Sequence, residues 1–176
     1  PLPKFGCVCS PLISGDYVYV QAGASFAKVD KRSGKIIWRT LKDGGGMYGS
    51  AFSSPTLAKL AGKQQILVQT RTSLAGVDPN DGRVLWSSKI PAFRGMNIVT
   101  PTVSVDTVFT SAYGGRSLLF GIAQEEGAFR LTNTWTNKAQ GYMSSPVVID
   151  GHAYLHLRNQ RLTCIELASG KTKWTT

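Results

Sequence analysis

The fold is decided by the stretch Val77-Asp78-Pro79-Asn80-Asp81-Gly82-Arg83-Val84-Leu85-Trp86, whose pattern recurs elsewhere in the chain. An apolar residue and an acid lead through turn-forming residues to a glycine. A tryptophan follows four residues after that glycine, at the end of a run rich in β-forming residues. This pattern predicts a strand, a tight turn and a second strand.

Three further copies of the pattern are present. Two copies, at residues 29–38 and 165–174, keep the four-residue distance between glycine and tryptophan. The third runs from Ile122 and spaces the two residues by eight, which predicts an insertion in its turn or strand. The repeat glycines are Gly34, Gly82, Gly127 and Gly170, and the repeat tryptophans are Trp38, Trp86, Trp135 and Trp174.

A second marker, a serine or threonine followed by proline, gives the same period. It occurs at Ser10-Pro11, Ser54-Pro55, Thr100-Pro101 and Ser145-Pro146, at intervals of 44, 46 and 45 residues. The segments between markers are rich in Val, Ile, Thr, Tyr and Phe and are interrupted by glycines, which is typical of strands. We therefore predict an all-β protein, a β-propeller of four-stranded antiparallel blades within a single domain, 1–176. The expected blades are 11–54, 55–100, 101–145 and 146–176.

The repeat resembles that of pyrroloquinoline quinone (PQQ)-type β-propellers. The resemblance is clearest in residues 30–38 and 166–174, where an acid and a turn are followed by Ser-Gly-Lys and a closing tryptophan. It spans the whole chain. It implies that each tryptophan docks against the neighbouring blade near a repeat glycine. The family includes quinone-dependent dehydrogenases and cofactor-free scaffolds, such as the lipoprotein subunit of the outer-membrane β-barrel assembly machinery.

Because propellers of this type commonly have eight blades, the resemblance implies that four repeats make half of a ring. A half-ring leaves two open blade faces and unprotected edges. The chain also begins at Pro1 rather than at a methionine. We therefore expect a part of a longer protein or a half that self-associates with a second copy. A closed four-bladed ring is the alternative.

The chain has 20 basic and 10 acidic residues, a net charge of +10. Such an excess suits acidic partners, anionic lipid headgroups or nucleic acid. Along the sequence the charges do not cluster: Lys35, Arg83 and Lys171 recur after repeat glycines and the others are scattered over loops. This scatter predicts a soluble basic surface and makes nucleic acid an unexpected partner. No apolar run is long enough to predict a transmembrane segment.

The carboxylates do not form a recognisable catalytic set. Nine of the ten fall in turns or at repeat positions, and only Asp43 has no place in the repeat. No pair therefore remains for acid–base chemistry. His152 and His156 are four residues apart in a predicted strand, roughly 13 Å at a rise of about 3.3 Å per residue. That separation is too large for one metal ion, and no metal site is expected.

The cysteines also differ from what a quinoprotein would need. Resemblance to PQQ alcohol dehydrogenases would imply adjacent bridged cysteines, a catalytic aspartate and calcium ligands. Here Cys7 and Cys9 are separated by Val8, and the remaining cysteine is Cys164. A bridge between Cys7 and Cys9 would be strained. We expect small structural residues at these positions and no cofactor.

We therefore expect a non-catalytic scaffold for protein–protein interaction, which the resemblance places in the periplasm or another extracytoplasmic compartment of a bacterium. Its partners would be other proteins. The predicted partner-binding residues lie at blade entries and carry aromatic or arginine side chains: Tyr48, Phe93, Arg94 and Tyr142. Two alternatives stay open: a fragment of a PQQ-dependent quinoprotein dehydrogenase that uses PQQ with calcium to oxidise alcohols or sugars, and a small-ligand-binding sensor domain.

Overall fold

The computed structural model describes residues 5–6, 8–22, 24–43 and 51–176. In these ranges the chain forms sixteen strands, arranged as four four-stranded sheets, and a single 3-10 turn, η1 (Phe93–Gly95). The strands of each sheet are hydrogen-bonded in chain order and antiparallel. The predicted all-β fold of four-stranded antiparallel blades is confirmed. None of the described residues belongs to a helix long and apolar enough to cross a membrane.

The first two sheets contain eight strands of three to seven residues. In chain order they are β1 (Leu12–Ser14), β2 (Tyr17–Gln21), β3 (Phe26–Asp30), β4 (Ile36–Thr40), β5 (Thr56–Leu60), β6 (Lys63–Gln69), β7 (Ser73–Val77) and β8 (Val84–Lys89).

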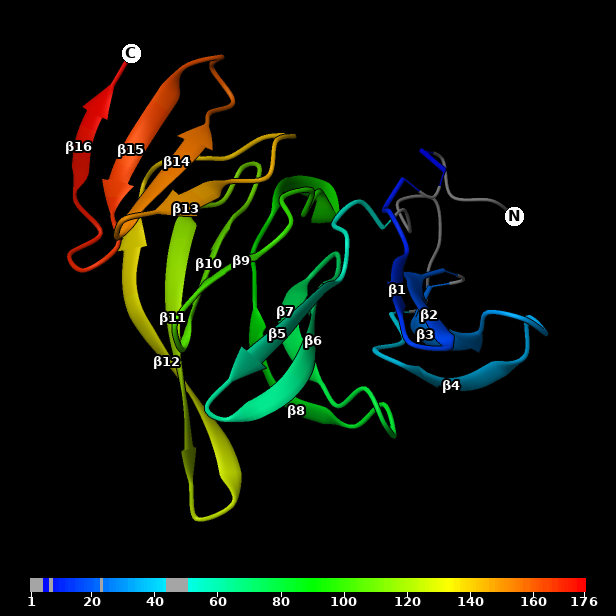
Figure 1. Ribbon diagram of the computed structural model, residues 1–176. Coiled ribbons are helices and arrows are strands. Elements are labelled where there is room, and N and C mark those ends of the chain that lie inside the picture. The colour runs from blue at the N-terminus through cyan, green and yellow to red at the C-terminus, as the bar shows by residue number, and fades with distance from the viewer. Residues whose placement is uncertain (1–4, 7, 23, 44–50) are drawn as a thin grey trace.

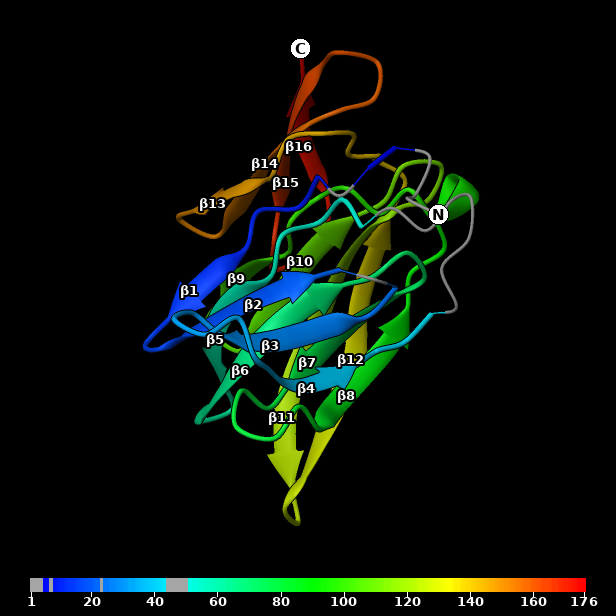
Figure 2. The same ribbon diagram turned by 90° about the vertical axis from the view of Figure 1, so that its right-hand side faces the viewer.

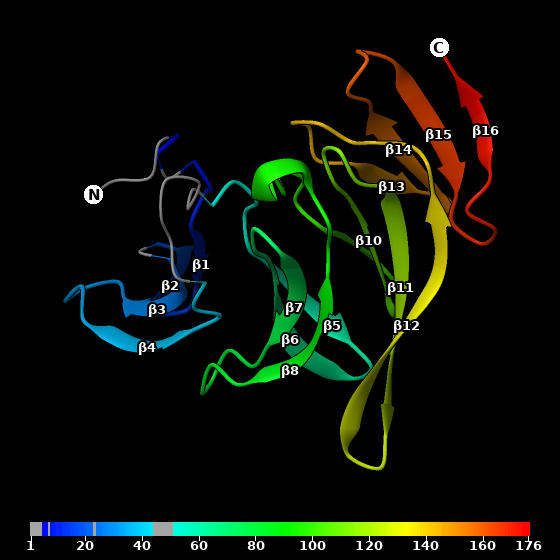
Figure 3. The ribbon, with the colours of Figure 1, turned by 180° about the vertical axis from the view of Figure 1, so that it is seen from behind.

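The last two sheets follow the same order, with a longer hairpin in the third. Their strands are β9 (Thr102–Ser104), β10 (Thr107–Ser111), β11 (Ser117–Glu125), β12 (Ala128–Asn137), β13 (Val147–Ile149), β14 (His152–His156), β15 (Leu162–Glu166) and β16 (Thr172–Thr175). The sheets stand side by side in an arc, from the blue first sheet to the orange and red fourth (Figure 1, and from behind in Figure 3).

The serine and threonine markers connect neighbouring sheets. The Ser10 backbone N–H donates to Ser54 Oγ at 2.9 Å, and the Ser54 N–H donates to Thr100 Oγ1 at 3.4 Å. These bonds lie just before the first strand of each sheet. At these two links the marker hydroxyl, of Ser54 and of Thr100, accepts a backbone N–H of the preceding repeat.

Apolar side chains fill the spaces between sheets. Three buried clusters are present, one at each junction between neighbours. Phe26 and Ile66 belong to the first, Trp86 and Phe120 to the second, and the third includes Phe109, Leu155 and Ile165. Since burial of apolar surface is the main stabilising term, each sheet depends on its neighbours for its core.

Two repeat tryptophans dock as the family resemblance implies. The Trp38 indole N–H donates to the Asn80 carbonyl at 3.2 Å, and the ring lies against Gly82 of the next sheet. The Trp135 indole N–H donates to the Leu167 carbonyl at 2.6 Å, and its ring lies against Gly170.

The docking expected at Gly127 does not occur. The hairpin of β11 and β12 is nine and ten residues long in its two strands, and it carries Gly127 beyond the neighbouring sheet. This hairpin protrudes at the lower end of Figure 2. Trp86 instead packs at Gly76 of its own sheet and donates to Gln65 Oε1 at 2.7 Å. The eight-residue spacing in this repeat thus marks lengthened strands that move the glycine away from Trp86.

Each end sheet holds one further unmatched member of a tryptophan–glycine pair. Trp174 in β16 remains 43% exposed, with Tyr154 of its own sheet as its aromatic neighbour. Gly34 has no described heavy atom within 4 Å of the position where a Cβ would lie. Each end of the arc therefore presents one half of a docking contact.

The repeat acids cap their turns. Asp30 Oδ1 accepts hydrogen bonds from the backbone N–H groups of Arg32 and Ser33 and from the Ser33 hydroxyl. These bonds from Ser33 lower the pKa of the Asp30 carboxyl. In the last repeat, hydrogen bonds from the Ser169 hydroxyl and the Lys173 ammonium lower the pKa of Glu166. The acid recurs because an ionised acceptor stabilises the tight turn.

Candidate functional site

Because each sheet is an antiparallel meander, successive connections between its strands lie at opposite ends of the sheet. The turn face carries the turns from first to second and from third to fourth strand: 15–16, 30–35, 61–62, 78–83, 105–106, 125–128, 150–151 and 166–171. The connection face carries the other loops and the links between sheets: 22, 24–25, 41–43, 51–55, 70–72, 90–101, 112–116, 138–146 and 157–161. In Figure 1, η1 marks the connection face and the long β11–β12 hairpin marks the turn face.

Three aromatic rings meet on the connection face. Phe93 lies in η1, and Tyr113 lies in the loop between β10 and β11. Their ring centroids are 5.7 Å apart in an edge-to-face arrangement. Tyr142, which precedes the fourth sheet, has its ring centroid 5.1 Å from that of Tyr113. Both distances are typical of favourable aromatic pairs.

Two arginines lie over these rings. The Arg94 guanidinium is 5.0 Å from the Phe93 ring centroid, and the Arg158 guanidinium is 5.2 Å from the Tyr113 ring centroid. Cation–π contacts of this kind hold a guanidinium at an aromatic surface without neutralising it. Arg94 also adopts a left-handed backbone conformation, with φ 53° and ψ 28°. Such a conformation is uncommon for a residue other than glycine and is often found at functional sites.

The row of rings continues toward the first sheet. Phe5 and Phe52 have ring centroids 6.3 Å apart. A small cavity of about 50 Å³ separates them from Phe93, and its walls also include Arg94 and Met96. Phe5 is 50% exposed and Phe93 is 49% exposed. We term the whole set the aromatic surface: Phe5, Phe52, Phe93, Arg94, Met96, Tyr113, Tyr142 and Arg158.

Backbone hydrogen bonds hold the central segment in place. The buried Asn97 side chain donates to the carbonyls of Thr70, Arg71 and Ile90 at 3.1 to 3.2 Å. The Phe93 N–H donates to the Tyr113 carbonyl at 2.8 Å. The segment 93–97 of the aromatic surface is therefore held to the loops that follow β6, β8 and β10.

The structure places Phe93, Arg94 and Tyr142 together in the aromatic surface, while Tyr48 lies outside the described residues. Their role in partner binding stays a prediction. Sequence reasoning missed Tyr113, which contacts both Phe93 and Tyr142. Its loop position has no counterpart in the repeat markers. Phe5 was detectable, because Phe5-Gly6 precedes the first marker much as Arg94-Gly95 precedes the third.

The acids lie almost entirely on one face, whereas the bases lie on both. Nine of the ten acids lie on the turn face, and the tenth, Asp43, has a carboxylate oxygen 3.7 Å from the Arg71 guanidinium. Seven described basic residues lie on the connection face: Lys42, Arg71, Arg94, Arg116, Lys138, Arg158 and Arg161. The bases that are scattered over loops in the sequence therefore include seven at one end of the sheets, because the meander brings alternate connections to that end.

Bases on and near the turn face are balanced by its acids. Lys63 Nζ is 2.6 Å from Asp78 Oδ2, and Arg130 Nε is 2.9 Å from Glu125 Oε2. The excess positive charge of the chain therefore concentrates on the connection face, the same face that carries the aromatic surface.

No three metal-ligating side chains gather anywhere in the described ranges. His152 and His156 lie at the two ends of β14, and a ring nitrogen of His152 is 2.7 Å from the Asp150 carbonyl oxygen. Cys9 donates its thiol hydrogen to the Gln21 carbonyl, Cys164 is buried, and Cys7 lies outside the described residues.

Four-stranded blades, joined at two of their three junctions by a tryptophan docked at a repeat glycine, define a β-propeller of the PQQ-repeat class. The family model described as outer membrane protein assembly factor BamB matches residues 5–176, so the chain belongs to this family. A search of curated proteins found no match to the sequence.

Solved structures share the fold at low sequence identity. BamB from Moraxella catarrhalis superposes with a TM-score of 0.71 at 16% identity, over 94% of this chain and 47% of that protein. The quinohemoprotein alcohol dehydrogenase ADHIIG from Pseudomonas putida HK5 gives a TM-score of 0.66 at 13% identity, over 100% and 34% of the two chains. The quinohemoprotein alcohol dehydrogenase from Comamonas testosteroni gives 0.64 at 14% identity, over 97% and 35%. The chain therefore spans about half of the first of these proteins and about a third of the other two.

Proposed function

We propose that this chain is a non-catalytic propeller scaffold that binds another protein through the aromatic surface. The observation that carries the proposal is the row Phe93, Tyr113 and Tyr142, in which three separate segments bring their rings into contact. Partly exposed aromatic and arginine side chains on a fixed backbone are the usual anchors of protein interfaces. A scaffold of this kind needs no reacting group.

The description of the family suggests what kind of partner the chain binds and in which compartment. A family described as an outer membrane protein assembly factor suggests that the partner is another component of an outer-membrane protein assembly machinery. It also suggests an extracytoplasmic, periplasmic location. The chain covers 47% of the BamB structure. A role in outer-membrane protein assembly, which the family description gives for a whole protein, is therefore a proposal for this chain.

The quinoprotein alternative is favoured by one observation, the likeness of fold to two quinohemoprotein alcohol dehydrogenases. The described residues fit PQQ and calcium poorly. Nine of the ten acids lie on the turn face, and the tenth, Asp43, is paired with Arg71, so no acid lies beside a second one on the connection face. Titration with PQQ and calcium, followed by absorbance and by dye reduction with an alcohol, tests this alternative. Saturable PQQ binding with turnover would replace the scaffold proposal.

The scaffold proposal is tested by measuring affinity for purified components of the outer-membrane assembly machinery of the source organism. The test variant is Phe93→Ala/Tyr142→Ala. The control is Val105→Ala/Ile149→Ala, which removes exposed apolar side chains at the opposite end of the sheets. Loss of two interface anchors is expected to weaken binding by about tenfold or more. The control is expected to stay within about twofold.

Circular dichroism and urea unfolding establish that both variants fold. Equal affinity of the wild type and the aromatic variant, or an equal loss in both variants, would reject the aromatic surface as the binding site.

A further inference from the structure

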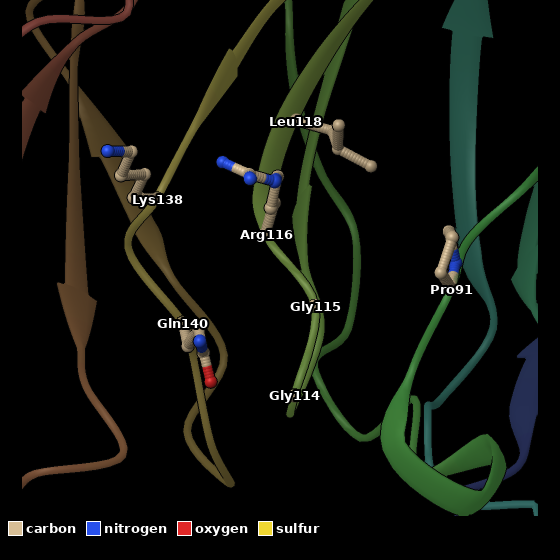
Figure 4. A pocket seen from close by; sticks show the side chains of 7 residues that line it. All are labelled: Pro91, Gly114, Gly115, Arg116, Leu118, Lys138 and Gln140. Carbon is tan, nitrogen blue, oxygen red and sulfur yellow. The ribbon is translucent and has the colours of Figure 1, made fainter.

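A cleft on the connection face lies beside the aromatic surface, around the loops that border the third sheet. It consists of two adjoining pockets of about 580 and 450 Å³. Lys138 and Gln140 line both pockets. Arg116 and Leu118 line the first, and Arg158 lines the second. Figure 4 shows Leu118 extending toward Pro91, while the Arg116 side chain extends toward the segment that carries Lys138.

The cleft is lined by cations that have no acidic partner. Arg116, Lys138 and Arg158 are exposed, and none of their side chains forms an ion pair or hydrogen bond with another described residue. The Arg158 side chain contacts the Tyr113 ring. None of the described residues that line the two pockets is acidic. Like charges around a concave surface raise the local concentration of anions.

One uncharged group in the cleft also lacks a partner. Gln140 Oε1 is buried and receives no hydrogen bond from the part of the chain that the structure describes. A buried acceptor without a donor is costly, by about 1–3 kcal/mol in general. The backbone of Gln140 is fixed, since its carbonyl accepts the Arg158 N–H at 3.0 Å. A ligand with N–H groups would supply the missing donor when the amide turns toward it.

We propose that the cleft binds an acidic segment of the protein partner. The inference rests on the proposed function and names the chemistry that the partner presents beside the aromatic surface. A peptide with several carboxylates matches the three cations, and its backbone N–H groups match Gln140. Charge-assisted hydrogen bonds between carboxylates and arginine are among the stronger polar contacts. The two pockets share Lys138, so an extended segment can occupy both.

The charge of the whole connection face, beyond the three cations of the cleft, supports the same partner. Seven described bases and one paired acid occupy the connection face, whereas the bases near the turn face are balanced by acids. An acidic segment is therefore steered to the face that carries both the cleft and the aromatic surface.

The test uses a fluorescein-labelled peptide of ten glutamates and fluorescence anisotropy. The test variant is Arg116→Gln/Lys138→Gln. The matched control, Arg83→Gln/Lys171→Gln, removes the same net charge from the turn face. We expect the cleft variant to lose about fivefold or more in affinity and the control to lose less than twofold. Binding is expected to weaken as salt rises, because exposed charges are screened.

Two results would overturn the proposal: no binding of the glutamate peptide at low salt, and equal losses in the two variants. A third would replace it: binding to phosphatidylglycerol vesicles that depends on Arg116 and Lys138 while the peptide does not bind. If the peptide fails to bind but the assembly components still bind through Phe93 and Tyr142, the acidic-segment inference falls and the scaffold proposal stands.

Discussion

Trp135 lies against Gly170 so closely that a Cβ atom on residue 170 would come within 2.5 Å of the indole Cδ2 atom. The same indole donates its N–H to the Leu167 carbonyl at 2.6 Å. The contact therefore requires a glycine at position 170 in the fourth sheet. It also gives the indole N–H of Trp135, in the third sheet, a hydrogen-bond acceptor. This pairing explains why glycine and tryptophan recur together in the sequence.

Gly170→Ala is expected to destabilise the protein much more than Gly34→Ala. Both glycines have a left-handed backbone, with φ of 69° and 70°, so both substitutions carry a strain of about 1–2 kcal/mol. Only residue 170 faces a neighbouring ring, and overpacking adds about 1–3 kcal/mol. Urea unfolding of the two variants measures the difference. Equal losses of stability would show that the close contact at Trp135 is unimportant.

Val105→Asn is expected to stabilise the protein by roughly 1 kcal/mol. Val105 is 85% exposed and has a φ of 52°, a conformation that is unfavourable for a β-branched side chain. Asparagine adopts it more readily, and little packing is lost. Val147→Asn is the control, because Val147 is exposed but lies in β13 without a positive φ. An unfolding midpoint for Val105→Asn at or below that of the wild type would contradict the prediction.

The stability of the protein is expected to fall in acid partly through Asp78. Burial raises the pKa of its carboxyl, but hydrogen bonds from Lys63 and the Asn80 N–H, with nearby positive charge, outweigh burial and lower it overall. A folded-state pKa below the unfolded value, about 3.9, gives stability that is present above that value and lost as pH falls through the folded pKa.

We therefore expect Asp78→Asn to be less stable than the wild type at pH 7 and to lose less stability between pH 7 and pH 3. Urea unfolding at both pH values measures this. The control Asp81→Asn removes a more exposed carboxylate of the same turn, which is 4.0 Å from Arg83. If Asp78→Asn showed the full acid dependence of the wild type, the Lys63–Asp78 pair would not contribute to it.

Expressed alone, the 19.0 kDa chain is expected to self-associate into a particle of about twice that mass. The two end sheets expose Trp174 and leave space at Gly34, and two copies joined end to end would complete both contacts. Light scattering measures the mass. Trp174→Ala is expected to shift the population toward monomer, whereas Phe93→Ala, on the connection face, is not. A wild-type chain that remains monomeric at high concentration would disprove the self-association of two four-blade halves.

The blade architecture was predictable because the information is local and repeated. The strand, turn and strand around Gly82 recur in the same order in each repeat. The marker hydroxyls of Ser54 and Thr100 each accept a backbone N–H from the preceding repeat. A period read along the sequence therefore corresponds directly to a period in space. Trp86 does not dock at the glycine of the next repeat, because the lengthened strands of that repeat carry Gly127 away from it. The eight-residue spacing predicts an insertion but not where it places the glycine.

The candidate site was only partly predictable, because it depends on which loops meet. Phe93, Arg94 and Tyr142 stood out as aromatic or basic residues at blade entries. Tyr113 did not, since its contacts with Phe93 and Tyr142 join segments that are 20 and 29 residues away in sequence. The uneven distribution of charge was hidden for the same reason: nine acids spread along the chain meet at the turn face, whereas seven bases from other loops meet at the connection face with one acid.

The most direct test of the central claim, that the aromatic surface is where a protein partner binds, is hydroxyl-radical footprinting of the chain with and without purified outer-membrane assembly components. We predict that oxidation of Phe93, Tyr113 and Tyr142 slows several-fold in the complex. Oxidation of Phe129, in the long hairpin at the turn face, should not change. Protection of Phe129 with unchanged oxidation of the three connection-face rings would contradict the account.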